Sequence, residues 1–166
     1  MNLPGVFSFN PPKLSALMQA GDTECGVTCL TMLARYYGIN TDLSVMRMKY
    51  PTGEQGLTVR QLLNIAEDIG LKARALSLGV EQLAKVKMPV ILHWNANHFV
   101  ILAKISRRGF VIHDPAAGRL LLDLNQVRAC FTGIVVELAP QAKIRTQTKS
   151  LLSAFLQWIS NSPKNI

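Results

Sequence analysis

The sequence is poor in cysteine, with three in 166 residues. A small domain built around disulfides would need a larger and even set, so we expect free thiols and a reducing compartment such as the cytoplasm. The first ten residues, MNLPGVFSFN, lack the basic start and long apolar stretch of a secretory signal. No run of eighteen apolar residues occurs, so no membrane-spanning helix is predicted.

Acidic residues are also scarce, with 10 Asp and Glu against 18 Lys and Arg and a net charge of +8. Half of this net charge lies in residues 141–166, which contain four basic residues and no acidic one. The other charges form no basic helix face interleaved with aromatic residues, the pattern that typically binds nucleic acids. We therefore predict no nucleic-acid partner.

The chain is 49% hydrophobic and long enough for one compact domain with an appendage. We predict an extended N-terminal arm over residues 1–12, a folded domain over 13–140, and a separate segment over 141–166. This last segment is first polar and basic and then amphipathic, which is typical of a linker or of a segment that lies on a membrane or a partner.

The first half of the predicted domain has helical periodicity. Apolar residues at 27, 30, 33 and 37 predict a helix that starts near Glu24 and ends at Gly38. A second, shorter helix is expected over residues 43–49. Thr58 and Gln61 have the spacing of a capping box, which predicts a third helix that Gly70 ends.

After Gly70 the apolar pattern changes to a period of two. Six short strands are predicted over residues 72–78, 89–94, 98–105, 109–114, 119–124 and 133–138, with one-turn helices near 80–87 and 124–131. Helices followed by a mostly antiparallel sheet define an α+β fold.

Cys25 is the first candidate for chemistry. It stands in the first turn of a predicted helix, where the helix dipole favours the nucleophilic thiolate, and Gly26 beside it leaves room for a substrate backbone. Gln19, six residues earlier, has a side-chain amide that can donate to an oxyanion together with the Cys25 N–H. Each residue also has an ordinary interpretation: most free cysteines are core residues, and most glutamines lie on the surface.

His98 is the candidate base and Asp114 the candidate orienting carboxylate. His98 begins one predicted strand and Asp114 ends the next, so a hairpin brings the two strand ends together. Both side chains lie on one face if the loop has an odd number of residues, and 107–109 are expected to form a three-residue loop. That register leaves the pair about four residues out of opposition, so a bulge or a strong twist is required.

The other histidines and cysteines are weaker candidates. His113 points away from the face of its neighbour Asp114, and His93 lies in an apolar run typical of a structural histidine. Cys29 falls among apolar residues and is read as core. The spacing of the three cysteines matches no common zinc signature, so no metal site is predicted.

Four segments, in this order and spacing, carry a family resemblance: QAGDTECGVTCLTMLARYYG, LHWNANHFVILAKI, FVIHDPAAG and FTGIVVELAP. Over about residues 13–140 the chain resembles the N-terminal peptidase domain of bacteriocin-processing ABC transporters, which cut double-glycine leader peptides. The resemblance implies a papain-like cysteine peptidase with nucleophile Cys25, base His98, orienting Asp114 and oxyanion residue Gln19. Trp94 is an additional candidate for lining the substrate groove.

The resemblance also implies partners and a location. The expected partners are a precursor peptide with a double-glycine leader and the transmembrane and nucleotide-binding domains of a parent transporter at the cytoplasmic face of a bacterial inner membrane. The peptidase domain needs no cofactor, whereas the full transporter is expected to use ATP. Two alternatives stay open: a docking domain that binds leaders without cutting them, and a cysteine transferase that uses the same residues.

Overall fold

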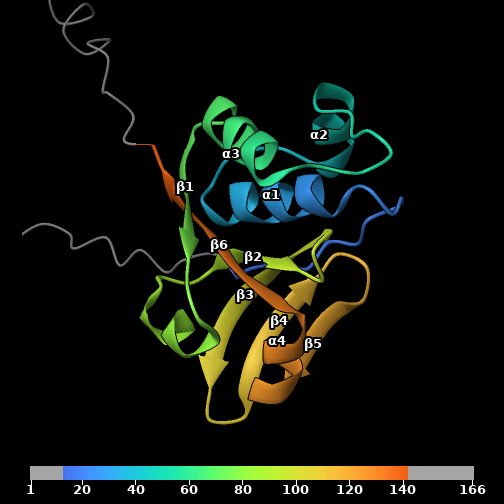
Figure 1. Ribbon diagram of the computed structural model, residues 1–166. Helices are drawn as coiled ribbons and strands as arrows, with labels where there is room; N and C mark the ends of the chain where they lie inside the picture. Colours follow the sequence, from blue (N-terminus) through green and yellow to red (C-terminus); the bar gives the residue numbers. More distant parts are fainter. Residues whose placement is uncertain (1–12, 142–166) are drawn as a thin grey trace, which may run out of the picture.

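In the computed structural model, which describes residues 13–141, three helices form a layer on a six-stranded antiparallel sheet (Figure 1). This confirms the predicted α+β architecture. The predicted arm over 1–12 and all but the first residue of the predicted segment 141–166 lie outside the described residues. The elements in chain order are α1 (Cys25–Tyr36), α2 (Leu43–Lys49), α3 (Val59–Asp68), β1 (Leu71–Ser77), the 3-10 helix η1 (Val80–Lys85), β2 (Val90–Trp94), β3 (His98–Ser106), β4 (Gly109–Asp114), β5 (Gly118–Leu122), α4 (Leu124–Cys130) and β6 (Phe131–Pro140).

The helix ends follow from local chemistry. α1 ends before Gly38, whose positive φ of 81° is a conformation that glycine adopts without steric cost. α3 begins with the predicted capping box, in which the Thr58 hydroxyl accepts from the Gln61 N–H and the Gln61 side chain accepts from the Thr58 N–H. The predicted starts and ends of the three helices are therefore confirmed.

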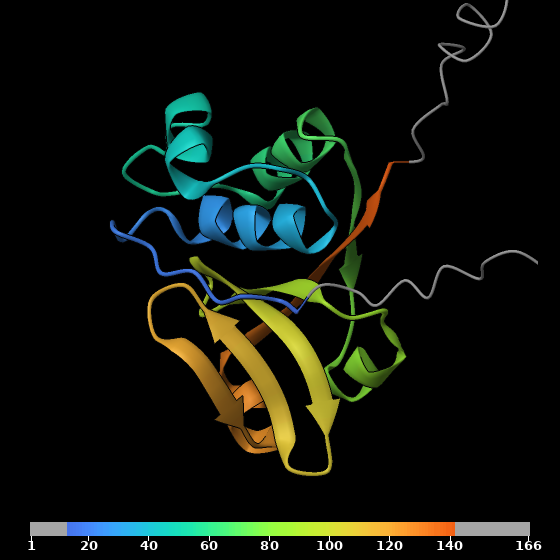
Figure 2. The same ribbon diagram turned by 180° about the vertical axis from the view of Figure 1, so that it is seen from behind.

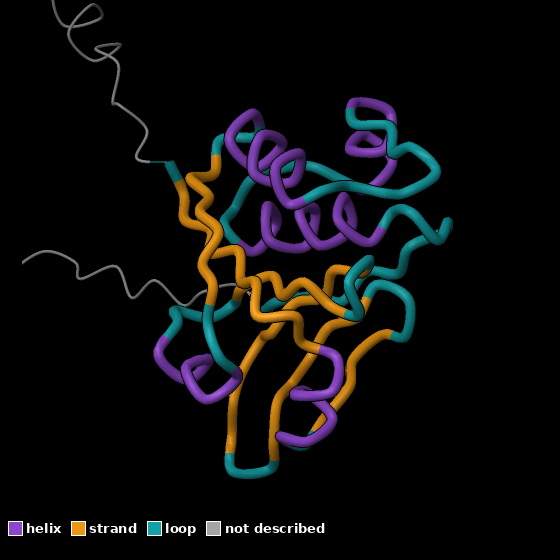
Figure 3. The backbone as a smooth tube through the Cα atoms, in the orientation of Figure 1, coloured by secondary structure: helices purple, strands orange, loops and turns teal. Residues whose placement is uncertain are grey.

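The strand order in the sheet is β1-β6-β2-β3-β4-β5, so the last strand of the described chain lies between β1 and β2 (Figure 3). All neighbouring strands are antiparallel. β6 begins at Phe131, two residues before the predicted start, because Phe131 pairs with Trp94 of β2. The register of this pairing shifts between Leu92 and Trp94.

Alternating residues of the strands fill two cores. Phe99 and Ile101 pack with the buried residues of α1 and α3, whereas Val100 and Leu102 pack with residues of η1 and α4 on the other side of the sheet. Figure 2 shows that β3 and β4 extend beyond the layer of α1 to α3, which covers only one end of these strands. His98 begins β3 and Asp114 ends β4, so both lie at the end close to α1 (Figure 1).

The β3–β4 hairpin corrects one prediction. Ser106 pairs with Gly109, so the loop has two residues and not the expected three. An even loop alone would place His98 and Asp114 on opposite faces of the sheet. A bulge at Ala103, between the pairs Leu102–Ile112 and Lys104–Val111, adds one residue to β3 and returns the two side chains to the same face.

Candidate active site

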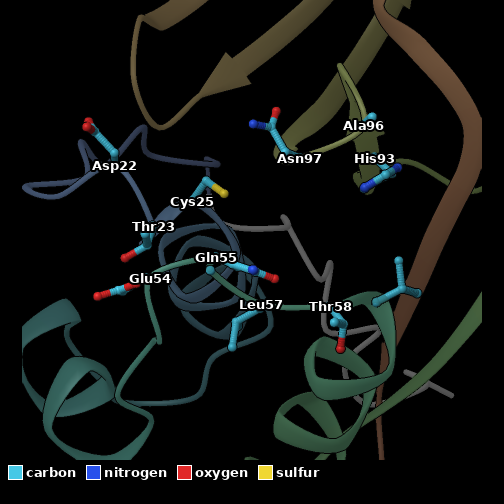
Figure 4. Close-up of a pocket in the computed structure, with 12 residues that line it drawn as sticks. Asp22, Thr23, Cys25, Glu54, Gln55, Leu57, Thr58, His93, Ala96 and Asn97 are labelled. Atoms are coloured by element: carbon cyan, nitrogen blue, oxygen red, sulfur yellow. The ribbon is translucent and has the colours of Figure 1, made fainter.

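Cys25 is the first residue of α1, where the unpaired backbone N–H groups of the helix are located. Its side chain is 3% exposed and lines a cavity of about 680 Å³ (Figure 4). The preceding residue, Glu24, occupies the N-cap position but makes no side-chain cap. A nucleophile placed here is held rigidly by the core packing of α1.

His98 connects Cys25 with Asp114. Its Nε2 lies 2.8 Å from Asp114 Oδ1, and the ring is close enough to Cys25 for that side chain to help raise the pKa of His98. Asp114 is oriented in turn by the Ala116 N–H, which donates to the same Oδ1 at 2.8 Å. The structure therefore brings together the thiol, imidazole and carboxylate that the sequence analysis selected from three distant segments.

The charges of this group are coupled. Burial on its own would lower the pKa of His98, but hydrogen bonds to Asp114 and Cys25 raise it to about 9. Burial would raise the pKa of Asp114, but the bonds from His98 and the Ala116 N–H lower it. At neutral pH this environment favours an imidazolium beside a carboxylate.

Gln19 lies on the segment that precedes α1. Its backbone N–H donates to the Pro115 carbonyl at 2.9 Å, so the glutamine is held beside the loop that follows Asp114. Its side-chain Oε1 is buried and has no hydrogen-bond partner within residues 13–141. The side chain is therefore not engaged through this atom in holding the fold.

The cavity beside Cys25 lies between the helical layer and the β2–β3 turn (Figure 4). Leu57 and Thr58 line it from the loop before α3, and His93 and Asn97 line it from the sheet side. Sequence reasoning did not select Leu57, Thr58 or Asn97. The capping box at Thr58 predicts the start of α3 but not a place beside Cys25. A contact between distant segments, the 3.0 Å hydrogen bond between Thr23 and Thr52, helps to hold the loop here.

The remaining histidines are placed differently from His98. His93 lines the cavity, but its Nδ1 lies 2.8 Å from the Thr132 hydroxyl and its pKa is lowered by burial. His113 is 6% exposed, and burial likewise lowers its pKa. Neither contacts a carboxylate in the described part of the chain, so neither has the orienting partner that His98 has.

The two predicted groove residues are both buried, and neither is among the residues that line the cavity. Trp94 is 6% exposed and packs in the core that contains Leu92 and Val100. Gly26 is needed for packing inside the protein: an added Cβ would lie 3.1 Å from Leu57 Cδ1 and 3.3 Å from Leu62 Cδ1. Its small size therefore lets α3 and the loop before it pack closely against α1.

The other cysteines lie apart from this chemistry. Cys29 is fully buried, its thiol donates to the Phe99 carbonyl at 3.4 Å, and burial raises its pKa well above the usual value. Cys130 is half-buried at the end of α4. Within residues 13–141, no three His, Cys, Asp or Glu side chains are grouped so as to hold a metal ion.

The helices packed on an antiparallel sheet, with Cys25 and the hydrogen-bonded pair His98 and Asp114 at one end of the sheet, are those of the papain-like cysteine peptidase class. The chain belongs to the peptidase C39 family, whose model matches residues 13–143. The probable microcin-H47 secretion/processing ATP-binding protein MchF of Escherichia coli is 37% identical over 139 residues, which cover 84% of this chain and 20% of the relative. The colicin V secretion/processing ATP-binding protein CvaB of E. coli is 35% identical over 136 residues, 82% of this chain and 20% of the relative.

Solved structures agree with this assignment. A double glycine motif protease from an AMS/PCAT transporter, in complex with the leader peptide, has a TM-score of 0.74 and 32% identity, covering 78% of this chain and 93% of that one. The peptidase domain of Streptococcus ComA has a TM-score of 0.70 and 21% identity, covering 77% and 99%, and supports the fold. This chain spans about a fifth of the length of MchF and CvaB. No helix in the described range is long and apolar enough to cross a bilayer.

Proposed function

We propose that this domain is a cysteine endopeptidase that removes the leader from a secreted peptide precursor by cutting after a Gly-Gly motif. The observation that carries the proposal is His98, which is hydrogen-bonded to Asp114 at 2.8 Å and lies close enough to Cys25 for that side chain to raise its pKa. The family membership and the likeness to a double glycine motif protease support the choice of substrate.

The proposed reaction has two stages. The Cys25 thiolate attacks the carbonyl carbon of the second glycine, and the Cys25 N–H and the Gln19 amide stabilise the oxyanion that forms. His98 then protonates the leaving amine as the C–N bond breaks, which leaves a thioester on Cys25. Water, deprotonated by His98, hydrolyses the thioester and releases the leader with a free carboxylate. Asp114 holds the His98 ring in position throughout.

The proposal also covers the setting of the domain. The E. coli relatives are named as secretion and processing ATP-binding proteins and are much longer than the part this chain matches. We place the domain in such a transporter, with membrane and nucleotide-binding domains as its partners and ATP used by those other parts. The predicted boundaries, a peptidase domain over 13–140 and a connecting segment over 141–166, belong to this proposal.

Incubation of the chain with a precursor peptide that contains a Gly-Gly junction, followed by mass analysis, tests the proposal. Wild type and the matched control Cys130→Ala are expected to yield leader and cargo as separate products, whereas Cys25→Ala yields none and still binds the leader. Binding without cleavage by wild type would identify a docking domain. Transfer of the leader acyl group to an added amine, in place of hydrolysis, would identify a transferase.

A further inference from the structure

The Glu24 side chain turns back over the segment that carries Gln19. Its Oε2 accepts hydrogen bonds from the Ala20 N–H at 3.0 Å and the Gly21 N–H at 3.2 Å, and it lies 2.8 Å from the Arg47 guanidinium. One carboxylate oxygen therefore binds three donors from two separate parts of the chain. Burial would raise the pKa of Glu24, but the bonds from Ala20, Arg47 and Gly21 lower it, so the carboxylate is charged at neutral pH.

These bonds complete a frame around Gln19. On one side the Gln19 N–H donates to the Pro115 carbonyl at 2.9 Å, one residue after Asp114. On the other side the next two N–H groups are held by Glu24, the residue directly before Cys25. The backbone at Gln19 is thus tied to the neighbours of both the nucleophile and the orienting carboxylate, although no secondary structure element includes it.

Arg47 fixes Glu24 from α2. Its guanidinium reaches Glu24 from the middle of this short helix, and its Nε is buried with no hydrogen-bond partner among the described residues. The side chains are 32% and 19% exposed, so the pair is partly shielded from water and from salt. The second ion pair of α2, between Lys49 and Asp68, is more exposed, with both side chains at 55%. Neither of its members bonds to the Gln19 segment.

We infer that Glu24, held by Arg47, is a positioning residue that fixes Gln19 where its side-chain amide donates to the oxyanion. The inference rests on the proposed function, because it assigns Glu24 a role in the same reaction. A donor acts fully only when it is held in place before charge develops. Loss of the Glu24 carboxylate releases two N–H groups next to Gln19 and lets the segment move.

A double-mutant cycle with Gln19→Ala and Glu24→Ala tests the inference in the full chain, with kcat and KM for leader cleavage as the measurements. Glu24→Ala is expected to lower kcat by about 10- to 100-fold, part of the loss for a missing oxyanion donor, with KM changed by less than about twofold. In the Gln19→Ala background the same change is expected to lower kcat by less than about twofold. Equal losses in both backgrounds would overturn the inference.

Companion variants separate positioning from other effects. Arg47→Ala is expected to lower kcat, as Glu24→Ala does, and Arg47→Lys is expected to lose less kcat than Arg47→Ala. The matched control Lys49→Ala is expected to leave kcat unchanged. If Glu24→Ala does not fold, Glu24→Gln takes its place in the cycle. The pH profile of Cys25 alkylation by iodoacetamide is expected to be the same in Glu24→Ala as in wild type. A shifted profile would mean that Glu24 acts on the Cys25 thiol, which would overturn the inference. Absence of cleavage by wild type would instead refute the proposed function, before any Glu24 variant is compared.

Discussion

At the scale of single residues, the proposed chemistry depends on one imidazole that serves two partners. His98 bonds to Asp114 through Nε2, and both Asp114 and Cys25 raise its pKa. His93 also lines the cavity, but it is bound to Thr132, which is not a charged group. The choice of base therefore follows from the partner of each ring and not from its distance to the cavity.

Replacement of each histidine by alanine distinguishes their roles. His98→Ala is expected to lower kcat by about 100- to 10,000-fold, the usual contribution of a general acid and base. His93→Ala and His113→Ala are expected to change kcat much less, because neither ring has a carboxylate partner in the described residues. Steady-state kinetics of leader cleavage measures all three. Similar losses in the three variants would show that His98 is not the unique base.

The raised pKa of His98 predicts a pH dependence of stability. The folded protein holds this proton up to a pH of about 9, whereas an unperturbed histidine loses it near 6.5. The stabilisation from His98 is therefore complete below about pH 6.5 and disappears as the pH rises to about 9. Urea unfolding of wild type and His98→Gln between pH 6 and pH 9.5 measures this. The stability difference should shrink with rising pH, and a constant difference would contradict the prediction.

At the scale of elements, the site depends on how closely α1 approaches α3 and the loop before it. Gly26 permits this approach, since an alanine Cβ would meet both Leu57 and Leu62 at 3.1 to 3.3 Å. Leu57 also lines the cavity beside Cys25. The packing of these helices and the shape of the cavity are therefore linked through one residue.

Gly26→Ala is expected to destabilise the fold by about 1 kcal/mol, because overpacking of about 1–3 kcal/mol outweighs a gain in helix propensity of about 1 kcal/mol. Cleavage should also slow, since Leu57 must move. Gly53→Ala is the matched control, because an added Cβ there meets nothing within 4 Å. Chemical denaturation of both variants gives the comparison. A stabilised Gly26→Ala protein would mean that propensity outweighs packing.

At the scale of the whole molecule, the helical layer carries the thiol and the sheet carries the imidazole and carboxylate. The two parts share the core of α1, α3 and the strands, and the cavity between them is lined mainly by the loops before α1 and α3 and by the β2–β3 turn. A cavity whose shape is fixed would discriminate against added substrate volume. If its narrow part admits only glycine at the cut, one methyl group is enough to misplace the reacting carbonyl.

Substitution of the substrate glycine next to the cut by alanine is therefore expected to lower kcat by about a hundredfold, the cost of a displacement on the order of 1 Å. Affinity should change little, whereas removal of the N-terminal half of the leader should weaken affinity first. A steady-state comparison of native, alanine-containing and truncated peptides measures both effects. Equal turnover of the alanine peptide would show that this domain is a broader cysteine peptidase.

The sequence by itself determined the elements and the candidate residues. The capping box of Thr58 and Gln61, the helix end at Gly38 and the period-two strands depend on contacts within a few residues, which local patterns record. The order of the Cys25, His98 and Asp114 segments carried the family resemblance. These features were predictable because they lie in one stretch of chain or in a shared motif.

Only the tertiary structure decided how the segments meet. A bulge at Ala103 compensates for a two-residue loop and places His98 and Asp114 on one face. The position of Trp94 in the core, the contact of Gly26 with Leu57, and the reach of Arg47 to Glu24 likewise depend on residues distant in sequence. Such features arise from packing between elements, where a shift of one residue reverses the direction of a side chain and leaves the local pattern unchanged.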